Sequence, residues 1–234
     1  MICVWKPVGL SPLEVIERLK LARTDLTAQK ITYAGRLDPL ASGVLVLLAG
    51  DERFNKDQYL NLPKTYEVEI LFGISTDTGD VLGLITDVEP KFIDLEFFQK
   101  SITQSVGVYN QLAPKFSSPG LDGKTFHKEI EIYSIKTISS CLLNSNILLK
   151  QIVSKISLVV GNFRQIEILV KWRSLLESND KNWTVVKVVV EASSGAYMRL
   201  LAENIGRKLG APALAYSIKR TKVGDWTADD CVDL

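Results

Sequence analysis

The stretch YAGRLDPLASGVLVLL, residues 33–48, places one acidic side chain directly before a strongly apolar run. Gly35 and Pro39 bracket Asp38, and this pattern of glycine and proline indicates a turn. The following VLVLL, residues 44–48, predicts a buried strand, although so short a run also suits a helix by periodicity alone. An aspartate before a proline commonly stabilises its own turn. Asp38 is therefore either a structural cap or a reactive carboxylate.

The composition predicts a compact, ordered protein. Of the 234 residues, 46% are hydrophobic and 24% are charged, which is enough apolar material for a sizeable core. The net charge of +1 lacks the strong basic bias of many nucleic-acid-binding proteins, so nonspecific coating of nucleic acid is not expected. A near-neutral sum is still compatible with a basic channel on one face.

Cysteine and histidine usage argues against a metal site and against a disulfide framework. Cys3, Cys141 and Cys231 lie far apart in no paired spacing, and His127 is the one histidine of the chain. Histidine-rich metal sites are thereby excluded, and zinc hydrolysis is not expected. The N-terminus has no basic region followed by a long apolar core, and no stretch approaches the length of a membrane span. We therefore expect a cytoplasmic protein with no metal and no membrane association.

Residue periodicity predicts an α+β fold around a mixed or antiparallel sheet. Residues 12–22 have the spacing of an amphipathic helix with Ser11 as its N-cap, and residues 66–73 alternate as a half-buried strand does. Proline, glycine and serine in residues 110–126 indicate a long loop. Strands outnumber helices. Further helices are predicted over 95–107 and 196–210, and further strands over 129–139, 155–160, 164–172 and 183–193.

Five segments resemble, in order, the motifs of the TruB family of pseudouridine synthases. The turn GRLDPLASGVL, residues 35–45, is similar to the family's G-x-L-D-P-x-A-x-G-x-L. Each segment alone is modest evidence, but the ordered set spans residues 6–224, and it implies the pseudouridine synthase fold. The other four segments are KPVGLS at 6–11, KTYEVEILFGISTDTGD at 64–80, SSGAYMRLLAENIGRKLG at 193–210 and IKRTKVG at 218–224.

The resemblance implies an enzyme that isomerises uridine to pseudouridine in RNA, with Asp38 as the catalytic group. The reaction oxidises and reduces nothing overall, so no cofactor is expected. The carboxylate could attack the sugar, attack the base or remove the C2′ proton, and the sequence leaves these three open. The target base must first leave its stack, at a cost of roughly a few kcal/mol. The implied substrate is the T-arm stem-loop of transfer RNA, at tRNA position 55.

Motif positions imply roles for residues around Asp38. Arg199 would pair with Asp38 and favour its ionised form. Tyr66 would stack on the extruded uracil, although its strand pattern alone indicates a core tyrosine. Leu200 would pack against the base and exclude water, and Lys6 would buttress the site.

Other positions depart from the family pattern or are expected to contact RNA. Tyr33 stands where many members carry histidine, and Arg36 stands where the family usually has threonine or serine; both are expected beside the substrate. The cations expected to bind phosphates are Lys124, Lys219 and Arg220.

The loop of about residues 110–130 resembles the segment with which the family clasps its RNA stem-loop. Gly120 replaces the first lysine of that segment, and its closing Ala-Arg is missing, which predicts a weaker clasp. The chain stops at Leu234, about where many members begin a small C-terminal PUA domain. We therefore expect one catalytic domain over residues 1–234, without that domain and monomeric.

Three functions compete at this point. The first is isomerisation of uridine in the T-arm of transfer RNA. The second is the same chemistry on another RNA such as ribosomal RNA, because the triplet around Asp38 also resembles the RluA and RsuA synthases. The third is an RNA-binding or RNA-folding protein that retains the scaffold without catalysis. The presence of Asp38, Tyr66 and Arg199 argues against the third.

Overall fold

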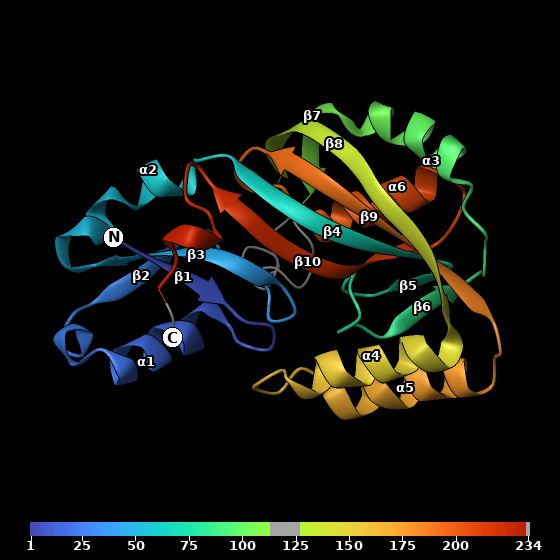
Figure 1. Cartoon of the computed structure of the whole chain (residues 1–234), viewed down its shortest axis with the longest axis horizontal. Coiled ribbons are helices and arrows are strands. Elements are labelled where there is room, and N and C mark those ends of the chain that lie inside the picture. Colours follow the sequence, from blue (N-terminus) through green and yellow to red (C-terminus); the bar gives the residue numbers. More distant parts are fainter. Residues whose placement is uncertain (113–126, 233–234) are drawn as a thin grey trace.

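The computed structural model describes residues 1–112 and 127–232 (Figure 1). The strands are β1 (Ile2–Lys6), β2 (Ile31–Ala34), β3 (Ser42–Ala49), β4 (Lys64–Phe72), β5 (Ile74–Thr76), β6 (Ile85–Val88), β7 (Gly107–Leu112), β8 (His127–Asn144), β9 (Asn182–Ala192) and β10 (Ala213–Val223). The helices are α1 (Pro12–Ala22), α2 (Lys56–Leu60), α3 (Leu95–Ile102), α4 (Ser145–Ser157), α5 (Gln165–Glu177) and α6 (Met198–Lys208). Within these described residues, no helix is long and apolar enough to cross a membrane.

One mixed sheet of eight strands forms the centre of the molecule. Its order is β1-β3-β10-β4-β9-β8-β7, and β2 pairs with β3 beside this path. Strands β3 and β10 run parallel over a short register, whereas the other pairs are antiparallel. Strands β5 and β6 form a separate small hairpin. The predicted α+β fold with a mixed sheet is confirmed.

Helices cover both faces of this sheet (Figure 1). Strand β4 alternates, so that Ile70 and Leu71 face opposite sides. On the Ile70 side lie α3 and α6, and on the Leu71 side lie the paired helices α4 and α5. Helix α1 packs its buried residues against β1 and β3. The centre of the sheet is thus buried on both faces.

The sequence-based prediction of strands over residues 155–160 and 164–172 is wrong, because α4 ends at Ser157, inside the first segment, and α5 covers the second from Gln165 on. Isoleucine and valine in these segments favour strands by local preference. Their buried positions, however, recur with a spacing of about four residues, which places them on one face of a helix. Burial of this face against the sheet therefore stabilises the helical conformation over the strand. The buried side chains are Leu148, Leu149, Ile152 and Ile156 in α4, and Ile168, Trp172 and Leu176 in α5.

Two other boundaries differ from the prediction. The helix expected over 95–107 ends at Ile102, and Gly107, with φ of +119°, begins β7. Strand β7 extends to Leu112, so the start of the predicted loop is in fact paired with β8. The rest of that loop, including Lys124, lies outside the described residues.

The start of helix α1 agrees with the sequence-based prediction. Ser11 caps α1 in a capping box with Glu14, as its position predicts, and Pro12 opens the helix.

The sulfur atoms of Cys3 and Cys231 lie 2.9 Å apart as free thiols. The sequence has no signal for this approach, because 228 positions separate the two cysteines.

We expect the docking of α5 to depend on Trp172. Its side chain is fully buried, and its indole Nε1 donates a hydrogen bond to the Val81 carbonyl. Trp172→Ala should lower the free energy of unfolding by about 3–5 kcal/mol, through lost burial and the cavity left behind. Ile166→Ala on the same helix, where the side chain is 84% exposed, should change it by less than about 0.5 kcal/mol. Urea denaturation compares the two variants, and equal effects would contradict this packing.

Candidate active site

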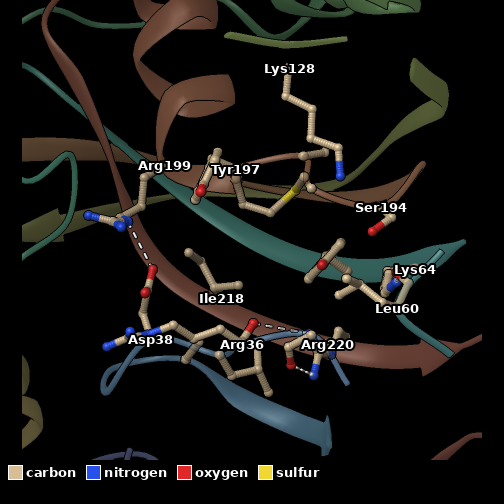
Figure 2. A pocket seen from close by; sticks show the side chains of 17 residues that line it. Arg36, Asp38, Leu60, Lys64, Lys128, Ser194, Tyr197, Arg199, Ile218 and Arg220 are labelled. Carbon is tan, nitrogen blue, oxygen red and sulfur yellow. Dashed lines mark hydrogen bonds and ion pairs between the residues drawn. The ribbon is translucent and has the colours of Figure 1, made fainter. Parts of the chain in front are cut away.

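A pocket of about 220 Å³ opens where the Asp38 turn, β4, β10 and the start of α6 meet (Figure 2). This is below the range of about 300–1,000 Å³ that is typical for drug-sized ligands, so it suits one small group such as a nucleobase. The lining residues are Gly35, Arg36, Leu37, Asp38, Ala41, Leu60, Lys64, Tyr66, Lys128, Ser194, Gly195, Ala196, Tyr197, Met198, Arg199, Ile218 and Arg220.

The turn between β2 and β3 carries Asp38 into this pocket. Lys6, whose side chain is fully buried, donates from Nζ to the carbonyls of Pro7 (2.9 Å), Pro39 (3.3 Å) and Ala41 (2.6 Å). Burial lowers the pKa of Lys6 to about 7. In its ammonium form Lys6 has three N–H donors, one for each of these three carbonyl oxygens, so Lys6 fixes the turn from inside. The prediction that Lys6 buttresses the site is confirmed.

Arg220 holds the other side of the same turn. It is 1% exposed, and its guanidinium donates to the carbonyls of Val44 (2.8 Å), Arg36 (3.3 Å) and Gly35 (3.1 Å). Each guanidinium nitrogen donates to the protein backbone and the side chain is buried, so Arg220 holds the turn from inside the fold rather than presenting its charge at the surface. β10 carries Arg220 close to β3 at Gly43, where an added Cβ would lie 2.1 Å from the Arg220 carbonyl oxygen.

Arg199 connects the Asp38 turn to the β5–β6 segment. Its Nε lies 2.9 Å from Oδ2 of Asp38 and 3.9 Å from Oδ2 of Asp80, and its Nη1 donates to the Thr78 carbonyl at 2.7 Å. The predicted pairing of Arg199 with Asp38 is thus present. Nε therefore holds Asp38 by an ion pair and makes no hydrogen bond in this geometry.

Arg199 and the carboxylates of Asp38 and Asp80 change one another's pKa values. Burial lowers the pKa of Arg199, but the carboxylates of Asp38 and Asp80 outweigh this effect and raise it. Burial raises the pKa of the Asp80 carboxyl, although Arg199 acts against this shift. The side chain of Asp38 is 28% exposed, whereas that of Arg199 is 4% exposed. Asp38 is therefore the member of the cluster that a ligand in the pocket can reach.

Tyr66 lines the pocket from the centre of β4, where it pairs across the sheet with Arg220 and Val190. It is 8% exposed, so it is both a core residue and a pocket residue. Leu200, which was expected to pack against the base, does not line the pocket. Consecutive helical residues point about 100° apart, so Leu200 turns away from the face of α6 that presents Arg199. Ile218 of β10 lines the pocket as an apolar side chain instead.

The remaining predicted contacts divide into those near the pocket and those away from it. Arg36 lines the pocket. Tyr33 does not; its ring packs beside the α1 core, with the ammonium of Lys56 5.6 Å from the ring centroid. Lys219 also lies outside the pocket lining, because neighbouring residues of β10 point to opposite faces, and its Nζ lies 4.0 Å from Glu67.

Several pocket residues have no role in the sequence-based account. Lys64 and Ser194 belong to quoted motif segments, and a motif therefore could have identified them. Tyr197 also lines the pocket and lies in the quoted segment 193–210. Lys128 lies near the end of the loop of about residues 110–130 and matches no motif position quoted above. Burial lowers the pKa of Lys64 to about 7, and Nζ of Lys64 donates to the carbonyls of Leu60 (2.5 Å) and Leu62 (2.6 Å).

The chemistry available here is that of a carboxylate beside a guanidinium, in a pocket that the Tyr66 side chain also lines. In the part of the chain that the structure describes, no group of three or more His, Cys, Asp or Glu side chains could hold a metal ion. The arrangement suits nucleophilic or base catalysis by Asp38 on a planar ring that lies against Tyr66.

Comparison with known proteins assigns the chain to a family. The family model of the TruB family pseudouridylate synthase (N terminal domain) matches residues 23–140, half of the chain. The chain belongs to the TruB family. This match includes Asp38 and Tyr66 but ends before Arg199. TruB membership therefore confirms the family resemblance that the ordered motifs predict.

Curated relatives extend the TruB similarity along the chain. The tRNA pseudouridine synthase B of Aquifex aeolicus is 27% identical over 98% of this chain and 70% of its own length. That of Ralstonia pickettii is 29% identical over 98% of this chain. The chain spans 64% of the length of the Ralstonia pickettii protein and 58% of that of the Psychrobacter cryohalolentis protein.

Two solved structures share the fold. A chain of a Cbf5-Nop10-Gar1 complex superposes with a TM-score of 0.65 at 18% identity, over 100% of this chain and 51% of that chain. A chain of an H/ACA RNP bound to a substrate RNA containing 2'-deoxyuridine superposes with a TM-score of 0.62 at 17% identity, over 99% and 50% respectively. These similarities confirm the pseudouridine synthase fold.

We expect Arg220 to act on stability rather than on RNA contacts. Arg220→Met leaves three buried carbonyls without their donor, and should lower the free energy of unfolding by at least about 2 kcal/mol. Below the melting temperature of the variant, the slope of log binding constant for RNA against log salt concentration should not change.

A phosphate contact made by Arg220 would instead reduce that slope by about 0.9. Lys219→Met is the matched control on the neighbouring position, where the side chain is 44% exposed. It should change the free energy of unfolding by less than about 0.5 kcal/mol. A stable Arg220→Met protein with a reduced salt slope would contradict the structural role.

Proposed function

We propose that this chain isomerises uridine to pseudouridine in the T-arm of transfer RNA, at position 55, without a cofactor. The observation that carries the proposal is the partly exposed Asp38 carboxylate, 2.9 Å from the buried Arg199 guanidinium, in a pocket lined by Tyr66. The names of the curated relatives support transfer RNA as the substrate. The catalytic assignment of Asp38 rests on this geometry together with the family motif.

The reaction moves one bond and one proton. The bond between C1′ of ribose and N1 of uracil breaks, the base turns, and a bond forms between C1′ and C5. The proton leaves C5 and N1 gains one, so no electron acceptor is needed. Asp38 acts by attack on C1′, by attack on the base or by removal of the C2′ proton. Each role requires an ionised carboxylate, which the Arg199 guanidinium favours.

The pocket can also keep the extruded base in place. Stacking on an aromatic side chain such as Tyr66 contributes about 1–3 kcal/mol per base. Ile218, Met198 and Leu60 supply apolar surface around the same space. Water is therefore displaced from the reacting atoms when a base enters. Extrusion of the base costs roughly a few kcal/mol, which stacking of this size largely offsets.

Release of tritium from C5-labelled uridine tests the proposal directly. The wild-type protein should release tritium from labelled transfer RNA and little from labelled ribosomal RNA. Asp38→Asn should abolish release while binding of RNA and the free energy of unfolding stay near wild-type values, because the substitution keeps the size of the side chain and removes its charge.

The outcomes separate the three functions. Release from ribosomal RNA alone would assign the same chemistry to another substrate. Binding of transfer RNA without release by the wild-type protein would indicate an RNA-binding protein. Turnover by Asp38→Asn, after mass spectrometry has excluded deamidation, would contradict Asp38 as the catalytic group.

A further inference from the structure

The pocket carries more positive charge than its chemistry at Asp38 requires. Five basic side chains line it, and Asp38 is the one acidic side chain among the described residues of the lining. Arg199 is paired with Asp38, while Lys64 and Arg220 donate to backbone carbonyls. These three basic residues thus have partners within the protein, so they do not need an anionic group from a ligand.

Lys128 differs from them. Among the described residues, its Nζ has no carboxylate within 4.0 Å and no hydrogen-bond acceptor, although the side chain is only half-exposed. Lys64 also lines the pocket, and the positive charge of Lys128 contributes to the lowering of the Lys64 pKa. In Figure 2, Lys128 extends from β8 toward the pocket, opposite the side on which Asp38 lies. A cation left without a partner in this position favours an anionic ligand.

The backbone is shaped to accept Lys128. Its side chain lies across Gly195, where an added Cβ would lie 2.6 Å from Nζ and 2.8 Å from Cε. Gly195 also has φ of +89°, a conformation that side chains rarely adopt. The neighbouring Ser194 is buried and lines the pocket, and its hydroxyl makes no hydrogen bond within the described part of the chain. An ammonium and a free hydroxyl therefore border the same end of the pocket.

We propose that Lys128, with Ser194 beside it, binds a phosphodiester group of the RNA that flanks the extruded uridine. This inference rests on the proposed function and adds a binding group to it. A lysine ammonium is a compact, strongly hydrated charge that binds phosphate as a point charge. Uracil is neutral, and its carbonyl groups do not require a full charge. The phosphodiester of an extruded nucleotide stays at the mouth of the pocket, where the half-exposed Lys128 can reach it.

A cycle that combines a protein substitution with an RNA modification tests the contact. The RNA is a T-arm hairpin in which one phosphodiester beside the target uridine, on the 5′ or the 3′ side, is replaced by an uncharged methylphosphonate. Lys128→Met should weaken binding of the unmodified hairpin about tenfold and reduce the salt slope by about 0.7–0.9. For the wild-type protein, one of the two modified hairpins should bind about tenfold more weakly than the unmodified hairpin. For Lys128→Met, the same modified hairpin should bind as well as the unmodified one, because the contact is already lost.

Two further variants complete the test. Lys128→Arg keeps the charge and should restore most of the affinity and the salt slope. Lys136→Met removes an exposed lysine from the same strand, β8, and should show the wild-type response to both methylphosphonates. The proposal would be overturned if each modified hairpin lost as much affinity for Lys128→Met as it loses for the wild-type protein.

The readouts keep this inference apart from the proposed function. Release of tritium from the unmodified hairpin by the wild-type protein tests catalysis, and the binding cycle does not depend on it. Turnover together with an unchanged affinity of Lys128→Met would refute only the phosphate contact. Binding that shows the expected coupling, without turnover, would refute only the catalytic proposal.

Discussion

The site depends on hydrogen bonds that two buried cations donate to the backbone of the Asp38 turn. Lys6 and Arg220 come from opposite ends of the chain, on β1 and β10, and both flank β3 in the sheet. Together they donate to five carbonyls between residues 35 and 44, and Lys6 also donates to Pro7. Burying a charge is costly unless it is paired or hydrogen-bonded. The turn therefore needs the two cations to hold its backbone, and the buried cations need the carbonyls of the turn as acceptors. The conformation of the turn is thus linked to the pairing of β3 with β1 and β10.

This linkage explains why residues so far apart in sequence make one site. The parallel contact of β3 with β10 brings Arg220 under the turn, and Gly43 allows the two backbones to approach. The same β10 carries Ile218 into the pocket, and its partner β4 carries Tyr66. Helix α6 then brings Arg199 to Asp38 from a third direction (Figure 2). The rigid parts of the fold therefore set where the carboxylate points, while Asp38 itself stays accessible.

The sequence predicts the turn, the strands beside it and the pairing of Asp38 with Arg199, because local pattern and ordered motifs encode them. It does not distinguish Arg220 from a phosphate ligand, since a motif gives residue types but not their burial. Leu200 fails for a related reason: one residue along a helix changes direction by about 100°, which a linear motif does not express. In α4 and α5 the strand preference of β-branched residues obscures the helical spacing of the buried positions. Lys128 reaches the pocket only through the pairing of β8 with the rest of the sheet, a long-range contact without a local signal.

The single-turnover rate of Lys6→Met measures the central claim most directly. Lys6 is fully buried, so it touches the turn and not the RNA. With the variant shown to be folded at the assay temperature by circular dichroism, the rate of pseudouridine formation at saturating RNA should fall about 100-fold, because the carboxylate is misplaced. The dissociation constant for RNA should stay near the wild-type value. An unchanged saturating rate, or a loss confined to the dissociation constant, would contradict the view that the buried cations position Asp38.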